Sequence, residues 1–442
     1  MPSSHVSPGP EKPSRRRPRQ LVQPLPADLV ERLDGHLATF ATHLREGLLA
    51  ASTAVGLEIL DELMGAEVDL LAGTKGRHRR DRAAYRHGSE PGTVTLGGRR
   101  VPVRRPRVRS ADGAAELPLA TYETAKQTDL LAEGIVARML AGLSTRRYRV
   151  GLEPVGEAIE ERALATSPTA ISRRFVAATA ERLAELLGRR LDDRRYLAIM
   201  LDGFNLGEHL LVAALGIDEG GTKVPLGVVE GTTENGAVVN ALLSDLRDRG
   251  LEVREGLLFV VDGGSAIGSA IRTFFGETIA VHRCHRHKER NILEHLPEIE
   301  RPLVQRRLRA AWAEQDPEAA KAALLSLARR LAHSRPGAAA SLREGLNDTL
   351  TLTRLGVTGA LRRTWESTNP MESMIEIVKT HARRVKHWES GEMALRWTAA
   401  GMLAAETQFR RVQGYRELPL LAAALKRELH IESETTAANQ PI

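Results

Sequence analysis

The chain has 442 residues, enough for two to four domains, and only 4% of them are aromatic, so its cores must be mainly aliphatic. Its single cysteine, Cys284, excludes an intrachain disulfide and favours a reducing compartment. The net charge of +7 favours a polyanionic partner. No apolar run approaches the roughly 20 residues that cross a bilayer, and the start lacks a signal-peptide core, so we expect a cytoplasmic protein with no membrane partner.

The N-terminal part is predicted to be a tail followed by helices and a hairpin. Residues 1–25 are rich in Pro, Ser and Arg without apolar periodicity, which indicates a disordered basic tail. In the next part, 26–125, apolar residues three or four apart at 27–33 and 57–64 indicate helices. Two short strands around a Gly-Gly turn at 93–103 predict a β-hairpin.

This hairpin lies in a strongly basic stretch. Residues 75–109 hold twelve lysines and arginines against only Asp81 and Glu90, and such a local surplus favours a nucleic-acid partner. Arginines on the outer face of a hairpin can follow a phosphate backbone, and a merely solvated sheet edge is the alternative. The candidate DNA contacts here are Arg79, Arg80, Arg104 and Arg105.

Residues 126–190 return to a helical pattern. Ser167 is a suitable N-cap and Pro168 a suitable first helical residue, and paired arginines follow them. With a preceding helix at 155–164, the pattern is that of a helix-turn-helix DNA-binding domain, and an ordinary capped helix pair is the alternative. The candidate DNA contacts are Thr169, Ser172, Arg173 and Arg174.

From residue 191 to 297 the pattern is that of a mixed α/β region. Three apolar runs in succession, followed by alternating helices and strands, indicate a mixed sheet. The predicted strands are 196–202, 210–216, 224–229, 257–262 and 279–284, and the predicted helices are 236–249 and 265–275.

The remainder is predicted to be helical, with an insertion at 298–362 and the completion of the α/β domain, plus C-terminal helices, at 363–442. The fold class is therefore α+β and multidomain. Helices and a hairpin form the N-terminal part, and a mixed α/β domain is interrupted by an all-helical insertion.

Three acidic residues have suggestive positions in this pattern. Asp202 and Asp262 each end an apolar run, and Glu372 lies in a segment that begins a helix. An acid at the end of a buried strand is costly unless its charge is compensated, and a divalent metal ion is a common answer. The long stretch between Asp262 and Glu372 exceeds what a loop needs, which agrees with a structured insertion.

Each acid also has a purely structural explanation. Asp202 and Asp262 precede glycines and could be turn residues. With Asn369 as the N-cap, Glu372 would be the third helical residue and could close a capping box. Glu376, one helical turn further on, is the alternate acid.

Four segments together resemble the bacterial mutator-type insertion-sequence transposases. They are Leu-Asp-Gly at 201–203, Val-Asp-Gly at 261–263, Arg-Cys-His-Arg-His-Lys-Glu-Arg-Asn at 283–291 and Ser-Thr-Asn-Pro-Met-Glu at 367–372. The resemblance covers most of the chain. It implies an RNase-H-like catalytic domain with an Asp-Asp-Glu triad, the DDE motif, at Asp202, Asp262 and Glu372, and it implies metal-dependent DNA transposition. One departure is Val261, where the family usually has a serine.

The expected cofactor is a pair of Mg²⁺ ions about 3.5–4 Å apart, for which Mn²⁺ may substitute, because hard cations prefer oxygen ligands. Cys284 and His287 resemble the family's Cys-x-x-His pair. A zinc site usually has four ligands in two separated pairs, and the nearby His282 and His285 are not expected to converge with them. We therefore expect no zinc and assign Cys284 and His287 to active-site support.

Basic residues follow Glu372 on the same predicted helix. Glu372, Lys379 and Arg383 share a helix face, so one end of the face would hold metal and the other DNA. The alternative is an exposed ladder of ion pairs. The candidate DNA contacts are Lys379, Arg383 and Arg384. Trp365 could stack on a DNA base or belong to the core.

The leading functional hypothesis is a DNA transposase that cleaves and joins phosphodiesters at insertion-sequence ends. Its expected partners are double-stranded DNA, as terminal inverted repeats and as target, and further copies of itself, at least a dimer on DNA. Such a protein would be nucleoid-associated. The alternatives are a non-catalytic DNA-binding regulator on a transposase scaffold and an RNase-H-like nuclease without strand joining.

Overall fold

The computed structural model describes residues 47–77, 83–96, 99–127, 132–152, 155, 157–164, 167–231, 236–253, 255–263 and 265–438. The chain divides into two compact units. Unit 1 comprises residues 1–97, 101–127 and 153–163, and unit 2 comprises 98–100, 128–152 and 164–442. The predicted tail at 1–25 and the predicted helix at 27–33 lie outside the described residues.

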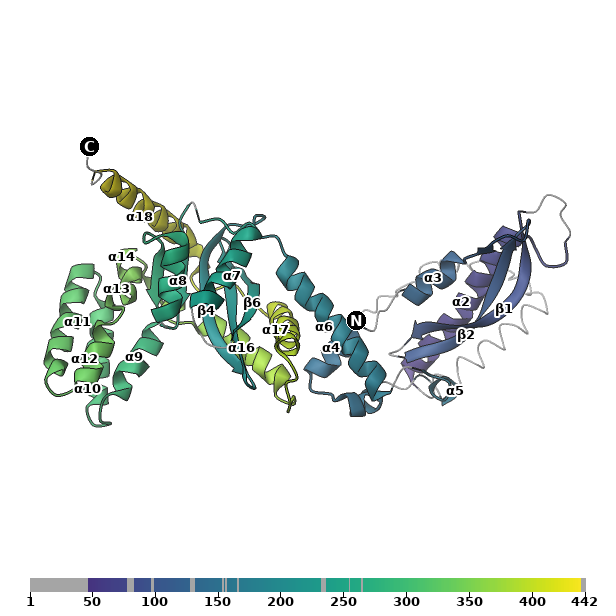
Figure 1. The fold of residues 1–442 in the computed structure, drawn as a ribbon, viewed down its shortest axis with the longest axis horizontal. Coiled ribbons are helices and arrows are strands. Elements are labelled where there is room, and N and C mark those ends of the chain that lie inside the picture. Colours follow the sequence, from purple (N-terminus) through teal and green to yellow (C-terminus); the bar gives the residue numbers. More distant parts are fainter. Residues whose placement is uncertain are drawn as a thin grey trace, which may run out of the picture. The chain divides into compact units, whose positions relative to one another are not determined.

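Unit 1 is a small sheet covered by helices (Figure 1). Helix α2 (Leu48–Ala72) packs on β1 (Ala84–Leu96) and α3 (Ala120–Gln127), and the sheet has the order β1-β2-β3. Strand β2 (Arg99–Ser110) pairs antiparallel with β3 (Glu116–Leu117). The core includes Met64, Val68, Val94, Val108 and Tyr122. The predicted helix and the two strands are confirmed, but the strands are 13 and 12 residues long rather than short.

The segment between the two sheets differs from its prediction. Helix α4 (Ala132–Leu140) and the 3-10 helix η1 (Thr145–Gly151) precede a four-residue helix, α5 (Glu157–Glu160). The predicted helix at 155–164 is therefore confirmed only over α5, and its last residue, Leu164, is extended and exchanges two backbone hydrogen bonds with Arg100. Apolar spacing alone could not reveal this bridge because Arg100 is distant in sequence.

Helix α6 (Pro168–Gly188) begins as predicted. The Ser167 hydroxyl accepts a hydrogen bond from the Ala170 amide at 3.3 Å, and Pro168 occupies the first turn, where its missing amide proton costs nothing. The helix is 21 residues long and buries Ile171, Phe175 and Leu186. It is thus anchored to the core of unit 2 along its length.

The centre of unit 2 is a five-stranded mixed sheet of order β6-β5-β4-β7-β8. Strands β4, β5 and β6 form an antiparallel meander, and β7 and β8 add parallel to β4. Their bounds are β4 Tyr196–Leu206, β5 His209–Asp218, β6 Lys223–Gly231, β7 Leu258–Val261 and β8 Ala280–Arg283. All five predicted strands and both predicted helices, α7 (Gly236–Asp248) and α8 (Ser265–Phe275), are confirmed.

Helices cover both faces of this sheet, as its continuous apolar strands require (Figure 1). On one face Ile199 and Leu201 of β4 pack with residues of α7 and α8. On the other face Ala198 and Met200 pack with α6, α16 (Asn369–Ala382) and α17 (Gly391–Glu406). The alternation of β4 side chains between two cores fixes its register.

A helical block joins β8 to α16 and has its own core, which includes Leu308, Trp312, Leu324 and Leu342. Its helices are α9 His285–Glu294, α10 Arg301–Ala313, α11 Pro317–Ala332, α12 Pro336–Arg343, α13 Leu346–Thr349, α14 Thr351–Arg354 and α15 Gly359–Trp365. Beyond α17 come η2 (Tyr415–Glu417) and α18 (Leu418–Ala438). The fold is mixed α/β with two sheets, and none of its described helices is long and apolar enough to span a membrane.

Candidate active site

Asp202 and Asp262 lie on neighbouring strands of the unit 2 sheet. Parallel strands β4 and β7 pair Leu201 with Val261, so the two aspartates follow paired residues at the same edge of the sheet. Asp202 does not end its strand, because β4 continues to Leu206 along β5. It lies where β4 extends past the end of β7, and the residue is 8% exposed.

Glu372 comes to the same place from α16, which packs against β4. The predicted helix register is wrong by one residue: Thr368 is the N-cap, so Glu372 is the fourth helical residue rather than the third. The Thr368 hydroxyl donates a hydrogen bond to Glu372 Oε1 at 3.0 Å, and the Glu372 amide donates to the Thr368 carbonyl at 2.8 Å. Glu376 is exposed.

Cys284 and His287 form a third component of this cluster. Cys284 follows β8, and its amide donates to the Val261 carbonyl at 2.8 Å, directly before Asp262. One helical turn later, His287 Nδ1 lies 3.3 Å from the buried Cys284 Sγ. His287 Nε2 is 3.9 Å from Glu372 Oε1, and its Nδ1 is 3.5 Å from the Thr368 hydroxyl.

Electrostatics link the acids. Burial, reinforced by the neighbouring Asp262 carboxylate, raises the pKa of Asp202 to about 7. His287 and the Gly203 amide lower it in part, and Glu372 raises it further. Like charges gathered at a desolvated site in this way create a strong demand for a cation.

Cys284 and His287 shift each other in opposite directions. Burial alone would raise the pKa of the Cys284 thiol, but hydrogen bonds with His287 lower it below its ordinary value. The hydrogen bond with Cys284 raises the pKa of His287 against the effect of burial, and Asp262 and Asp202 add to this. The pair therefore favours the protonated form of His287, beside the three acids.

Three neighbours, Gly263, Arg283 and Thr368, were not predicted as site residues. Gly263, next to Asp262, has a φ of 121°, and a Cβ there would lie 2.3 Å from Arg283 Nε, so only glycine fits. The buried Arg283 guanidinium donates to the Glu344 carbonyl at 3.1 Å. Of the three, Thr368 could have been identified from the sequence, because it stands four residues before Glu372, one helical turn away.

Among the described residues, no group of three or more His, Cys, Asp or Glu side chains is already arranged to hold a metal ion. The acids fit a hard divalent cation in chemistry, because all three offer carboxylate oxygens and the other two both raise the pKa of Asp202. Cys284 is directed to His287 and fully buried, which suits a supporting role.

The residues predicted to contact DNA differ in their exposure and in their partners. Arg79 and Arg80 lie outside the described residues. Arg105 is bound to Glu90 and to Glu116 at 3.2 Å, so its charge is already neutralised. Arg174 is half-buried near Tyr148 rather than free on the surface. The exposed candidates are Arg104, Thr169, Ser172, Arg173, Lys379, Arg383 and Arg384. Trp365 is fully buried and belongs to the core, so it cannot stack on a base in this conformation.

The sequence is similar to known transposases over most of its length. The transposase for insertion sequence element ISRM5 of Rhizobium meliloti (strain 1021) is 29% identical over 356 residues, which cover 79% of this chain and 85% of that protein. The transposase for IST2 of Acidithiobacillus ferrooxidans is 29% identical over 177 residues, 40% of this chain and 58% of that protein. The transposase for IS6120 of Mycolicibacterium smegmatis is 24% identical over 204 residues, 45% of this chain and 62% of that protein.

A family model described as "Transposase, Mutator family" matches residues 38–411, which include both sheets, the helical block and all three acids. The resemblance stated from the four sequence segments is thereby confirmed. The chain belongs to the Mutator family of transposases.

Proposed function

We propose that this chain is a DNA transposase that hydrolyses phosphodiester bonds at the ends of an insertion sequence and joins the freed strands to target DNA. In this proposal unit 2 is an RNase-H-like catalytic domain, and residues 298–362 are its helical insertion. The sheet order β6-β5-β4-β7-β8, with a meander followed by parallel strands, supports that assignment.

The observation that carries the proposal is the register of β4 and β7. Because Leu201 pairs with Val261, Asp202 and Asp262 are adjacent, and Glu372 is close enough to contribute to the raised pKa of Asp202. Three acids from distant parts of the chain lie near one another at the same edge of the sheet, where Asp202 is buried. Their mutual repulsion destabilises the fold, and such a destabilising cluster of charges is typical of a functional site.

We propose Asp202, Asp262 and Glu372 as the residues that hold two Mg²⁺ ions, for which Mn²⁺ can substitute. When bound, such ions supply an activated nucleophile and stabilise charge on the departing oxygen.

The residues around the acids have supporting roles in this proposal. The Thr368 hydroxyl holds the Glu372 carboxylate in one orientation. His287, whose protonated form Cys284 and the acids favour, would present a positive charge to an incoming phosphate. The partners proposed are duplex DNA and at least one further copy of the chain, because two transposon ends require two active sites.

The test is cleavage of a duplex that carries the terminal inverted repeats of the element encoding this chain, in millimolar Mg²⁺. Asp262→Asn and Glu372→Gln each remove one proposed ligand and should lower cleavage at least about a hundredfold. Glu376→Gln is the matched control, because it removes an exposed acid one turn along the same helix and should leave cleavage unchanged.

Two other outcomes identify the competing functions. If Asp262→Asn nicks as well as the wild type, or neither nicks, the chain is not the proposed enzyme, and a DNA-binding regulator is favoured. Cleavage without any strand-transfer product would instead identify a nuclease that does not join strands.

A further inference from the structure

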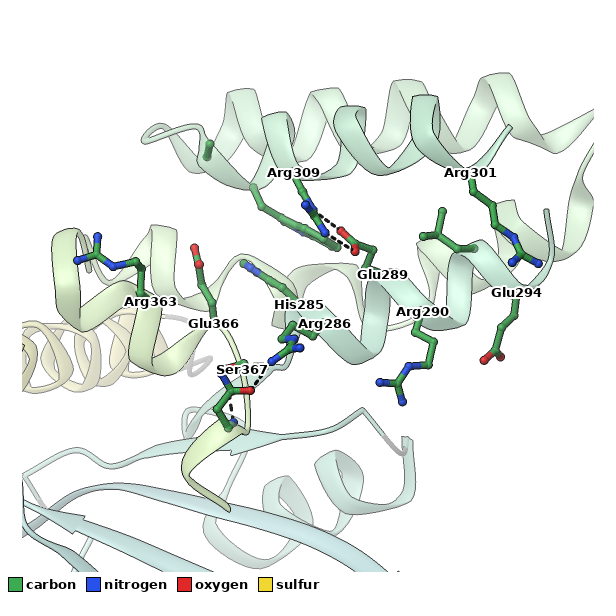
Figure 2. A pocket seen from close by; sticks show the side chains of 14 residues that line it. His285, Arg286, Glu289, Arg290, Glu294, Arg301, Arg309, Arg363, Glu366 and Ser367 are labelled. Atoms are coloured by element: carbon green, nitrogen blue, oxygen red, sulfur yellow. Dashed lines mark hydrogen bonds and ion pairs between the residues drawn. The ribbon is translucent and has the colours of Figure 1, made fainter. Parts of the chain in front are cut away.

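A groove of about 910 Å³ lies in unit 2, lined by residues of the helical block and of the segment that leads into α16 (Figure 2). Helices α9 and α10 form two of its sides, and the segment that connects α15 to α16 forms a third. The groove is continuous in sequence with the site, because its lining residue His285 follows Cys284 and its lining residue Asn369 lies three residues before Glu372.

The groove is lined by five arginines and three glutamates, and two of these glutamates are already bound to arginines. Glu289 accepts hydrogen bonds from Arg309 at 2.7 and 2.8 Å, which Figure 2 marks with dashed lines. Glu366 accepts one at 2.7 Å from Arg362, which is not a lining residue. These two acids therefore do not neutralise the other arginines of the lining.

Three exposed arginines of the lining have no ion pair with a carboxylate of the described residues. Arg286 donates to the Asn369 side-chain oxygen at 2.5 Å, which is a neutral partner. Arg290 and Arg363 have neither an ion pair nor a hydrogen bond with any described residue. Their guanidinium groups are free to bind an oxyanion in a two-pronged manner.

The spacing on α9 adds a second argument. Arg286 and Arg290 are four residues apart and share one face of the helix, so their charges repel each other. A bound polyanion would convert this repulsion into attraction to both. The floor of the groove is buried, and there the His285 ring stacks on Trp312 with centroids 4.4 Å apart.

We infer that this groove binds the sugar-phosphate backbone of the DNA strand that continues beyond the cleaved bond, with Arg286, Arg290 and Arg363 each on a phosphate. The inference rests on the proposed function, which brings a DNA strand to the neighbouring acids. It assigns to the groove the task of fixing the scissile phosphate relative to Asp202, Asp262 and Glu372.

The test is the salt dependence of DNA binding by the full chain without divalent metal, so that no strand is cut. The probe is a duplex that carries the terminal repeat and extends past the cleavage site. Replacing all three arginines by glutamine should lower the slope of log affinity against log salt by about 2.7, or about 0.9 for each phosphate contact. Replacing all three by lysine should keep the slope, because the charge is retained.

The matched control is a triple glutamine variant of exposed arginines of α10 and α11 outside the groove, Arg306, Arg307 and Arg329. It should leave the slope unchanged. An unchanged slope in the groove variant, or an equal fall in the control, would overturn the inference. This measurement does not involve cleavage, so failure of the proposed function appears separately, as a wild-type chain that binds the duplex but does not cut it in Mg²⁺.

Discussion

Asp202 carries an electrostatic cost in the folded chain. Its pKa is raised from the ordinary 3.8 to about 7, mainly by burial and then by Asp262. Between these two values the folded chain binds more protons than the unfolded chain, so the contribution of Asp202 to stability falls as the pH rises through this window. Above about pH 7 the full cost is present, on the order of 4 kcal/mol at most.

Asp202→Asn should therefore stabilise the metal-free chain while it abolishes cleavage. Its Tm should exceed that of the wild type at pH 8, and the difference should shrink toward pH 5, measured by thermal unfolding in EDTA. Asp248→Asn, at a mostly exposed aspartate, is the control and should show no such trend. A difference that is absent, or the same at every pH, would contradict the assignment.

Single residues of the site could be predicted to different extents. Asp202 and Asp262 were predictable, because an acid after each of two apolar runs reaches the same edge of a sheet once the runs pair. The start of α16 was predicted one residue late, because Asn369 and Thr368 are both good N-caps and only the packed helix shows which is used. The contact of Arg283 with Gly263 depends on tertiary packing that no local pattern contains.

At the scale of elements, the basic hairpin was predicted but its charge balance was not. Three arginines of β2, Arg104, Arg105 and Arg107, lie near one another, yet their environments differ. Arg107 binds Glu116 at 2.6 Å, and Arg104 binds the Ser89 hydroxyl at 2.9 Å. These cross-strand partners follow from strand register, which the sequence alone leaves open.

Adjacent arginines of this hairpin should consequently respond differently to substitution. Arg104→Gln should weaken binding of an arbitrary duplex, because its charge is exposed, and should leave the Tm unchanged. Arg105→Gln should lower the stability by about 1 kcal/mol, because it removes ion pairs with Glu90 and Glu116 and a stack 5.2 Å from the Tyr122 ring. Fluorescence anisotropy and thermal unfolding measure the two effects. Equal losses of DNA affinity in both variants would contradict the distinction.

At the scale of the whole molecule, the chain has two units with separate cores. Met64, Val94 and Tyr122 belong to the core of unit 1, whereas the strands around Asp202 belong to the cores of unit 2. The boundary predicted from the change of helical to strand periodicity at residue 191 does not coincide with this division, because α4 and α6 precede residue 191 and belong to unit 2. The return of residues 153–163 to unit 1 was not predictable, since it depends on packing of Val155 and Ile159 against Val101.

Separate cores predict separate unfolding, and the proposed metal site belongs to unit 2 alone. A ligand that binds only the folded form stabilises it by about 2.7 kcal/mol at a concentration one hundred times its Kd. Calorimetry should therefore show two transitions, of which millimolar Mg²⁺ raises only the one that belongs to unit 2. Asp262→Asn and Glu372→Gln should abolish that rise, and Glu376→Gln should retain it. If Mg²⁺ raises both transitions equally, or raises them in the ligand variants, then these three acids do not form the metal site, because a general salt effect would act on both units alike.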